Sequence, residues 1–537
     1  MKSFVRRVIT GLYRRLVYFN NNRKIARFAR EINNNSAKDS TNTVVIFNAS
    51  TRLIGMSQNA AFSLLTGWAL KLQGARVVQF VCNSGLKKCV LGTDITNVNN
   101  SPSCRICIKQ SQAFSAGIET RWFKFTPDDD INSKISNLNL EQLKSFEYEG
   151  FHLGQLVLPS LRWILRRHHI NDYADIHSLY KEYIVSAWNV KREFEKLIHE
   201  LQPKAVLIFN GMFYPEAMVK KVAQNMGIPA YTHEVSLQPL SAFFTDGEAT
   251  AYPIYIPQEF QLNDKQNDRL DEYLNQRFEG NFTMAGIQFW PEMQNLDREI
   301  VQKIDSFKHI VPVFTNVVFD TSQKHANIVF EHMFEWLDVT LELIKSNPDT
   351  LFIIRAHPDE LRTGKSSHEN VAGWVKKNDV EKLENVIFIN AKEFVSSYEL
   401  IRRSKFVMVY NSTIGLEASI MGAPVLCGGK ARFTQLPTVF YPRDKSDFLD
   451  LAEHMLSVET INIPAEYRIN ARRFLYYQLF ISSLPFDGFV KNDGVSNGYV
   501  TLKHIKWQDL LPENSQTTKT LVKGILEGKG FLLDHEA

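Results

Sequence analysis

Two stretches decide the fold: LFIIRAHPDE at residues 351–360 and FVMVYNSTIGLEASIMGAPVL at residues 406–426. Each begins as a continuous apolar run and stops abruptly at polar residues. Continuous rather than alternating hydrophobicity is typical of parallel strands that are covered on both faces. Polar residues at the carboxyl ends of such strands lie along the edge where open α/β sheets bind ligands. The two stretches therefore predict a parallel sheet with a ligand site at one edge.

The polar residues that follow these strands suit a phosphate group. Ser412 or Thr413 can cap a helix over Ile414–Met421, whose first turn offers N–H groups and the positive end of the helix dipole. Arg355 and His357, which can donate hydrogen bonds or carry positive charge, follow the neighbouring strand. The glycine pair at 428–429 brings Lys430 and Arg432 to the same edge. One such pair alone is usually a loop or a cap, but pairs at the ends of two strands favour a site. The candidate residues for a nucleotide phosphate are Arg355, His357, Asn411, Ser412, Thr413, Lys430 and Arg432.

The amino-terminal half also alternates strands and helices. TVVIFNAS at 43–50 predicts a strand, residues 57–73 predict a helix, and ARVVQFV at 75–81 predicts the next strand. A second strand–helix–strand unit is predicted over 203–234, and residues 127–200 between the two units are mostly helical in pattern. This β-α-β order is typical of a Rossmann-like domain.

The strand ends of this half supply a candidate base. Asn48, Asn210, His233 and Glu234 end three of the strands, so we expect them to face one crevice. Glu234 or His233 is then the candidate catalytic base for a substrate hydroxyl. Glu234 can equally be a structural acceptor for backbone donors, and both roles stay open.

Length and composition predict a two-domain α/β protein. With 537 residues and 44% hydrophobic content, the chain can form two cores. We expect two Rossmann-like domains that face each other across a cleft. The predicted divisions are a basic amphipathic segment with linker at 1–40, an N-terminal domain with a helical insertion at 41–300, a C-terminal domain at 301–450 and a helical tail at 451–537 that packs back on the domains.

The first 30 residues differ from the rest in charge. They hold nine Lys or Arg and no Asp or Glu, which leaves 53 basic against 58 acidic residues elsewhere. A helix here would place Arg6, Arg7 and Arg14 opposite an apolar side that also includes Arg15. Such a helix can lie in an anionic membrane interface, so residues 1–30 predict peripheral binding to the inner face of a membrane. A docked basic helix and a disordered arm are the alternatives. The apolar side consists of Phe4, Val5, Val8, Ile9, Leu12, Leu16 and Phe19.

Cysteine content and hydropathy limit the remaining classes. Five cysteines in so long a chain indicate a reducing cytoplasm rather than a disulfide scaffold. Four of them are near one another in sequence and can supply the thiolates of a structural zinc site, or they can be ordinary core thiols. No run of eighteen apolar residues predicts a membrane span, and the pattern of a nucleic-acid surface is missing, so we expect no nucleic-acid partner. The four candidate zinc ligands are Cys82, Cys89, Cys104 and Cys107.

A series of motifs resembles the capsular polysaccharide biosynthesis proteins, a group of GT-B-type, glycosyltransferase-like enzymes. The motifs are NVVFD at 316–320 before a helix that contains Trp336, IIRAHPDE at 353–360, and YNSTIGLEASIMGAPVL at 410–426. The segment 206–234 looks like the acceptor-domain segment of the same group. The resemblance implies a nucleotide-activated sugar held mainly by the second domain, with no metal or other cofactor in the chemistry.

The resemblance also implies residue roles. It places His357, Ser412 and Thr413 on the donor phosphate and Glu417 on the donor ribose. A pair of acids before glycine, as in the sialyltransferase catalytic motif, is missing; the nearest piece, TDGE at 245–248, has one acid there.

The leading prediction is a glycosyltransferase that builds a capsular or related polysaccharide, or its lipid-linked precursor, from a nucleotide sugar. Its partners would be that donor and a glycan or lipid-linked glycan acceptor. Breaking the sugar–phosphate bond leaves charge on the phosphate, which fixed donors such as Arg355 and His357 can stabilise. The alternatives are a CDP-linked polyol-phosphate transferase, a sugar-nucleotide epimerase and a non-enzymatic assembly or export factor.

Overall fold

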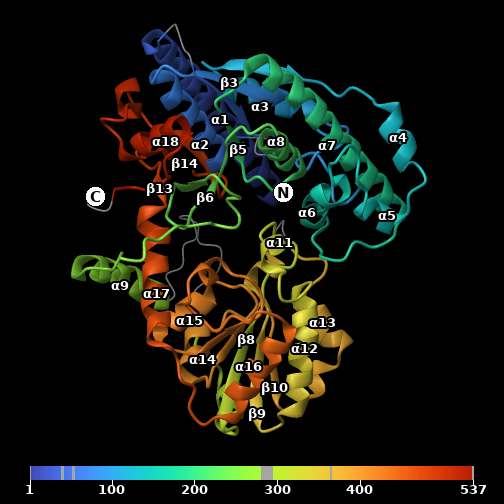
Figure 1. Cartoon of the computed structure of the whole chain (residues 1–537), viewed down its shortest axis with the longest axis vertical. Coiled ribbons are helices and arrows are strands. Elements are labelled where there is room, and N and C mark those ends of the chain that lie inside the picture. The colour runs from blue at the N-terminus through green and yellow to red at the C-terminus, as the bar shows by residue number, and fades with distance from the viewer. Residues whose placement is uncertain (1, 38–41, 51–54, 280–293, 363–365, 535–537) are drawn as a thin grey trace.

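The computed structural model describes residues 2–37, 42–50, 55–279, 294–362 and 366–534, with the side chains of residues 2–9 left out. The described chain forms two domains, one above the other in Figure 1, which face each other across a cleft. Each is built on a largely or wholly parallel sheet with helices on both faces. The predicted α/β class with two Rossmann-like, GT-B-like domains is confirmed.

The N-terminal domain contains a seven-stranded sheet in the order β13-β7-β6-β5-β1-β3-β4. Strands β1, β3, β4, β5 and β6 are parallel, whereas β7 and β13 are added antiparallel at one edge. The strands are β1 Thr43–Phe47, β3 Arg76–Cys82, β4 Glu119–Phe123, β5 Ala205–Phe209, β6 Ala230–Val235, β7 Ser241–Thr245 and β13 Leu484–Pro485.

Alternate residues of β1 show how this sheet is covered. Val45 and Phe47 join the core under α6, α7 and α8, and Val44 and Ile46 join the core under α1, α2 and α18. A small antiparallel sheet of β2, β15 and β14 closes the second face. The bounds are α1 Lys2–Asn35, α2 Gln58–Leu72, α3 Cys104–Phe114, α4 Asp129–Ile135, α5 Leu140–Lys144, α6 Leu153–Leu165, α7 Ala174–Leu201, α8 Tyr214–Asn225, α18 Gln516–Glu527, β2 Met56–Ser57, β14 Val490–Asn492 and β15 Tyr499–Leu502.

The C-terminal domain contains a five-stranded, fully parallel sheet in the order β10-β9-β8-β11-β12. The order reverses beside the central β8, where the carboxyl ends of β9 and β11 lie on either side of it. The bounds are β8 His309–Phe314, β9 Thr350–Arg355, β10 Val386–Ile389, β11 Val407–Val409, β12 Val425–Cys427, α10 Arg298–Asp305, α11 Gln323–Ala326, α12 Met333–Ser346, α13 Val371–Lys377, α14 Ser397–Arg403, α15 Ile414–Met421 and α16 Lys445–Ser457.

Two helices connect the domains, one in a place that the sequence did not indicate and one within the predicted helical tail. Helix α9, Asp264–Phe278, precedes the predicted boundary at residue 300, yet Leu270 and Leu274 pack in the core of the C-terminal domain. Helix α17, Ala465–Tyr476, leads the chain from the C-terminal domain back to the N-terminal one (Figure 1). Beyond α17 the tail is not only helical, because it supplies β13, β14 and β15.

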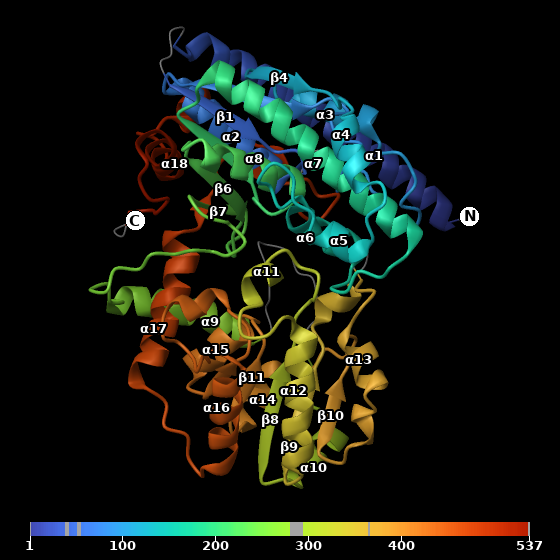
Figure 2. The same cartoon turned by 45° about the vertical axis from the view of Figure 1, so that its right-hand side comes forward.

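Helix α1 divides into two parts. Its second part docks on the N-terminal domain through Ile25, Phe28, Ala29 and Ile32, all buried. Its first part extends beyond the domain, as Figure 2 shows. The helix runs to residue 35, so it takes up most of the segment 1–40 that was predicted to hold an amphipathic helix and a linker. Among the described helices, none is long and apolar enough to cross a membrane.

The chain between residues 323 and 346 forms two helices rather than one. The chain forms the short α11, then a turn over 327–332, and then α12. His332 ends the turn because its Nδ1 accepts a hydrogen bond from the Glu335 backbone N–H, 3.1 Å away, and so caps α12. The break points α11 toward the cleft (Figure 1).

Candidate functional site

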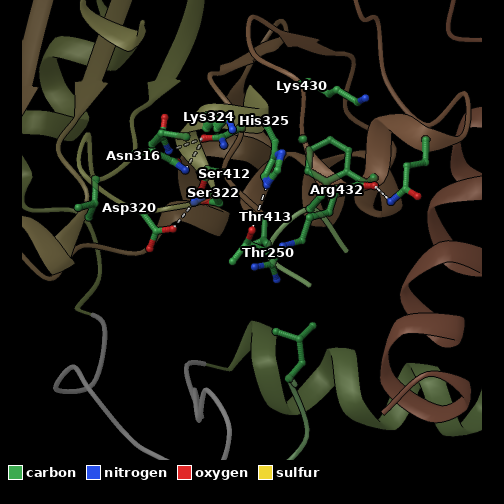
Figure 3. Close-up of a pocket in the computed structure, with 18 of the residues that line it drawn as sticks. Thr250, Asn316, Asp320, Ser322, Lys324, His325, Ser412, Thr413, Lys430 and Arg432 are labelled. Carbon is green, nitrogen blue, oxygen red and sulfur yellow. Dashed lines mark hydrogen bonds between the residues drawn. The ribbon is translucent and has the colours of Figure 1, made fainter. Parts of the chain in front are cut away.

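A cavity of about 460 Å³ lies between the two domains, at the carboxyl ends of the C-terminal strands. Figure 3 shows polar side chains from several loops turned into it. A smaller pocket of about 110 Å³ adjoins it, and four residues line both: Arg277, His357, Ser412 and Thr413. Most of the predicted phosphate-binding residues therefore meet at one place. The main cavity is lined by His357, Asn411, Ser412, Thr413, Lys430 and Arg432, together with Thr250, Asn316, Asp320, Lys324 and His325.

The local backbone fixes which nitrogen of His357 carries a proton. Nδ1 accepts a hydrogen bond from the Asp359 N–H at 3.1 Å, at the start of the short 3₁₀ turn Pro358–Leu361. Burial lowers the pKa of His357 from its ordinary value, so the ring is neutral near pH 7. A neutral ring with an accepting Nδ1 carries its proton on Nε2. In this form Nδ1 already accepts a hydrogen bond, and Nε2 is the nitrogen that can donate one.

The start of α15 provides hydroxyls and backbone amides. Thr413 stands at the capping position, but its side chain makes no capping hydrogen bond. The predicted helix Ile414–Met421 is observed, and the predicted side-chain cap is not. Gly415 lets the helix approach β11, since an added Cβ would lie 2.9 Å from Val409 Cγ2. The first turn thus presents two hydroxyls and a helix N-terminus to the cavity, an arrangement that suits a phosphate.

Asn411 has a scaffold role beside these groups. Its Oδ1 accepts hydrogen bonds from Asn316 Nδ2 at 2.5 Å and from Gln323 Nε2 at 3.4 Å. These contacts join the ends of β8 and β11 to α11. Asn411 reaches the cavity as predicted, and its amide oxygen holds the neighbouring loops together.

Arg355 lies on the side of the smaller pocket. Its side chain is buried, and its Nη1 donates to Ser397 Oγ. Burial lowers the pKa of Arg355 to about 10, which still leaves it cationic at neutral pH. Arg355 and His357 therefore both line the smaller pocket, and of the two only His357 also lines the main cavity.

Two cations come from the loop after β12. Arg432 stacks on Tyr252 of the N-terminal domain, with its guanidinium carbon 3.9 Å from the ring centre. Lys430 is exposed, and its backbone N–H donates to Ala326 of α11. The prediction that both lie at the strand edge of His357 agrees with the cavity lining.

Glu417 is already bound to protein groups. One oxygen accepts from Arg277 Nε at 2.5 Å and the other from the Tyr398 hydroxyl at 2.6 Å. Burial acts to lower the pKa of Arg277, but the Glu417 carboxylate raises it overall. Glu417 lines the smaller pocket, where its carboxylate orients Arg277. Sequence reasoning missed Arg277 because one arginine in a charged helix carries no signal of its own.

The strand ends of the N-terminal domain meet in a buried network. Asn48 Nδ2 donates to Ser63 Oγ at 2.9 Å, and Ser63 is bonded to His233 Nε2 at 2.8 Å. His233 is fully buried, which lowers its pKa to about 3, so this ring is neutral and shielded from solvent.

Glu234 belongs to a second part of this network. Its oxygens accept from Asn59 Nδ2 at 2.9 Å and from Asn210 Nδ2 at 2.8 Å. Glu234 does not line the cavity between the domains. Of the two roles left open by the sequence, this geometry suits the structural acceptor.

Glu248 and His325 form a contact that sequence reasoning missed. Glu248 follows β7 in the N-terminal domain, and its Oε2 lies 3.1 Å from His325 Nε2 on α11. The same nitrogen lies 3.0 Å from Thr250 Oγ1, as the dashed line in Figure 3 marks. The only signal in the sequence is TDGE at 245–248, which has one acid before its glycine and one after it.

The four candidate zinc ligands line one small cavity beside β3 and α3. Burial raises the pKa of Cys89 to about 12 and that of Cys82 above its ordinary range, so both are thiols here. Over the part of the chain that is described, the cysteines do not form a group of three ligand atoms within 4.8 Å of one another, whereas His168, His169 and His332 do. The structure gathers Cys82, Cys89, Cys104 and Cys107 without bringing their sulfurs to the spacing of a zinc site.

Two facing Rossmann-like domains, with a polar cavity at the edge of the second sheet, define a GT-B-like protein. Residues 288–437 match the family described as capsule polysaccharide biosynthesis protein, which confirms the resemblance over most of the donor-side motifs. A comparison with curated proteins found no match.

Solved structures with a similar arrangement include two KpsC transferases of Thermosulfurimonas dismutans. The β-Kdo 2,4 transferase is 11% identical with a TM-score of 0.36, covering 57% of this chain and 87% of that one. The β-Kdo 2,7 transferase is 14% identical with a TM-score of 0.32, covering 63% and 90%. A putative UDP-N-acetylglucosamine 2-epimerase from Listeria monocytogenes is 9% identical with a TM-score of 0.26, covering 91% and 97%.

Proposed function

We propose that the protein is a glycosyltransferase that moves a sugar from a nucleotide donor to a glycan, in the synthesis of a capsular or related surface polysaccharide. The observation that carries this proposal is the cavity between the domains. There, neutral and cationic hydrogen-bond donors at the edge of the C-terminal sheet face the N-terminal domain. The family match at 288–437 covers β8, β9, β11 and α15, which build that edge. The names of the two KpsC structures describe the same class of reaction.

The donor phosphates bind at the start of α15 in this proposal. His357 Nε2–H, the hydroxyls of Ser412 and Thr413 and the helix amides donate to the phosphate oxygens, and Lys430 and Arg432 add positive charge. As the sugar–phosphate bond breaks, negative charge grows on the leaving oxygen, and donors already in place stabilise it without reorganising. These groups act on the leaving group alone, so they suit transfer to any acceptor hydroxyl.

The nucleoside occupies the smaller pocket. Arg355, Arg277 and Glu417 form one wall, and Glu417 is the proposed partner of the ribose hydroxyls. A carboxylate oxygen can accept more than one hydrogen bond, so Glu417 can hold Arg277 and a ribose together.

A binding screen followed by product analysis tests the function. A ligand at a concentration of 100 times its dissociation constant stabilises the folded protein by about 2.7 kcal/mol. A thermal-shift screen of CMP-, CDP-, UDP- and GDP-linked sugars therefore identifies the nucleotide-sugar donor. Mass spectrometry of an oligosaccharide acceptor then shows the mass of one added sugar. An added polyol phosphate, or an isomerised nucleotide sugar without acceptor, would instead establish one of the competing reactions. A protein that neither binds nor turns over any of these compounds contradicts the proposal.

We also propose that the first part of α1 holds the enzyme on the inner face of a membrane, beside a lipid-linked acceptor. Leu12, Leu16 and Phe19 are 54%, 59% and 56% exposed, and their spacing of four and three residues puts them on one helix face. Arg14 and Arg15 lie between them in sequence and can meet anionic headgroups, at about 1 kcal/mol per cation near the surface.

Changing Leu12, Leu16 and Phe19 to Gln should release the protein from anionic vesicles at low salt. Because these side chains are exposed, melting temperature and donor binding should not change. Replacing two exposed isoleucines elsewhere, Ile106 and Ile469, by Gln is the control. Equal sedimentation of the triple variant and the control would exclude the anchor.

Structural zinc at Cys82, Cys89, Cys104 and Cys107 stays a separate proposal, which the shared cavity supports and the sulfur spacing does not. Metal analysis of purified protein should give about one equivalent of zinc, lost in Cys104→Ser. Protein without zinc, with unchanged melting in the variant, would leave four ordinary thiols.

A further inference from the structure

The contact between Glu248 and His325 joins the two domains at the cavity itself. Thr250, two residues after Glu248, and His325 both line the cavity, as does Lys324. Their position differs from that of Glu234, whose two oxygens are held by asparagine amides of the N-terminal domain.

The N-terminal domain holds this loop firmly. Thr232 Oγ1 donates to the Gly247 carbonyl at 2.8 Å and accepts from the Ala249 N–H at 2.9 Å. The other oxygen of Glu248 accepts from the Lys220 ammonium, which is nearly buried. One carboxylate oxygen of Glu248 is thus held by Lys220, and the other lies beside His325.

The charges around the imidazole keep it neutral and ready to take a proton. Burial lowers the pKa of His325, and the ammonium groups of Lys324, Lys220 and Lys430 act in the same direction against Glu248. Burial acts to raise the pKa of Glu248, but Lys220 and His325 hold it below its ordinary value. A carboxylate therefore faces a neutral ring. Thr250 Oγ1 lies 3.0 Å and Glu248 Oε2 lies 3.1 Å from the same Nε2. Because a carboxylate oxygen can only accept, we place the proton on Nε2 and the lone pair on Nδ1.

We infer that His325 is the catalytic base for the acceptor hydroxyl and that Glu248 positions it, a role that rests on the proposed glycosyl transfer. The acceptor O–H proton moves to His325 Nδ1 as the acceptor oxygen bonds to the anomeric carbon. The bond from that carbon to the phosphate oxygen breaks, and its electron pair leaves on the phosphate at α15. The imidazolium is stabilised by the Glu248 carboxylate and then loses its proton to solvent.

This assignment predicts inversion at the anomeric carbon. His325 lies on α11 of the C-terminal domain and contacts the loop of Glu248 and Thr250, whereas the phosphate donors lie at the start of α15. Attack from the side opposite the leaving phosphate inverts the sugar, and a base is needed there because the phosphate cannot reach that proton.

The tautomer of His325 can be measured without any substrate. In ¹⁵N-histidine spectra, the signals lost in His325→Gln identify this ring. The expected result is a protonated Nε2 and an unprotonated Nδ1 at pH 7.5, with that preference weakened in Glu248→Gln. A ring that carries its proton on Nδ1 overturns the inference.

Kinetics with the donor found in the screen provide the second test. A positioned base contributes about 100- to 10,000-fold, so His325→Gln should lose at least 100-fold in kcat while its donor dissociation constant changes less than threefold. Glu248→Gln should move the acidic limb of the kcat/KM profile and lower kcat. Since this change leaves the Lys220 charge buried, the double variant with Lys220→Met checks that the kinetic loss persists in a stably folded protein.

Asp246→Asn is the matched control, because this exposed carboxylate lies in the same loop but lines a different cavity. It should keep wild-type kcat and pH profile. Sugar transfer by His325→Gln at the wild-type rate, or a product with retained configuration, overturns the inference while the proposed function stands. Absence of sugar transfer by the wild-type protein, with any of the nucleotide sugars, overturns both.

Discussion

The buried pair of Glu417 and Arg277 gives a prediction with a defined size. Their side chains are 7% and 22% exposed and their charged atoms lie 2.5 Å apart. Replacing Glu417 by Gln keeps the shape and the hydrogen bond from Tyr398 but leaves a buried guanidinium without its counter-charge. Breaking one partner of such a pair costs about 3–5 kcal/mol.

The loss should be visible in thermal melting. For a domain of this size, 1 kcal/mol corresponds to about 2–4 °C, so Glu417→Gln should melt on the order of 10 °C lower. Glu453→Gln, the same chemical change on the exposed face of α16, should stay within about 0.5 kcal/mol of wild type. Adding Arg277→Met to Glu417→Gln should restore most of the loss, because removal of both charges leaves neither one unpaired.

The same variants separate two roles of Glu417. If the carboxylate contacts the donor ribose, the double variant should recover stability but not donor affinity. If its role is only to orient Arg277, Glu417→Gln and the double variant should lose affinity to the same extent as Arg277→Met alone. Melting of Glu417→Gln within 1 °C of wild type would refute the argument that this pair is a closed, buried ion pair.

Three further predictions test other parts of the structure. His357→Ala should lower kcat about 100- to 1,000-fold with a smaller change in donor affinity, measured beside the exposed control His454→Ala. Burial raises the pKa of Glu216 to about 7 from an ordinary 4.5, so between these pH values the folded protein keeps a proton that the unfolded chain has released. The free energy of unfolding should therefore fall by about 3 kcal/mol from pH 4.5 to pH 7. Urea titrations should show this loss in the wild type and not in Glu216→Gln. Gly428→Ala should cost about 1–3 kcal/mol in thermal melting, because its Cβ would lie 2.4 Å from Trp336 Nε1, whereas Gly488→Ala meets nothing within 4 Å and should not.

The donor side could be predicted because it is built from consecutive residues. Strand ends at Arg355 and Asn411 follow continuous apolar runs, and parallel strands bring such ends to one edge whatever the rest of the chain does. Helix α15 matched its predicted bounds because Gly422, with φ of +89°, ends it in a conformation that side chains other than glycine rarely adopt.

The parts that sequence could not predict depend on contacts between distant segments. Arg277 reaches Glu417 only after α9 packs on the far domain, and Glu248 reaches His325 only across the cleft. Whether Glu234 is a base or a structural acceptor depends on two asparagine amides, one of them 175 residues away. Hydrophobic periodicity carries no information on such pairs, because it reports the burial of a segment and not its neighbour.

The first part of α1 shows a similar limit. Leu12 and Ile25 belong to one continuous helix with one composition, yet Leu12 is exposed and Ile25 is buried. The sequence left membrane binding and docking as alternatives, and the structure assigns docking to the second part of the helix. Where the buried part of α1 ends depends on how far the surface of the N-terminal domain extends along the helix, which the sequence of the helix does not report.

The return of the chain to its first domain affects the order in which the protein can fold on the ribosome. Strand β7 ends at Thr245, but its neighbour β13 begins at Leu484, 239 residues later. At about 5–20 residues per second, the edge of β7 waits roughly 12–48 s for its partner. The complete C-terminal sheet emerges during that interval. The nascent chain therefore carries an open strand edge that is a target for chaperones, and its later domain can finish folding before its earlier one.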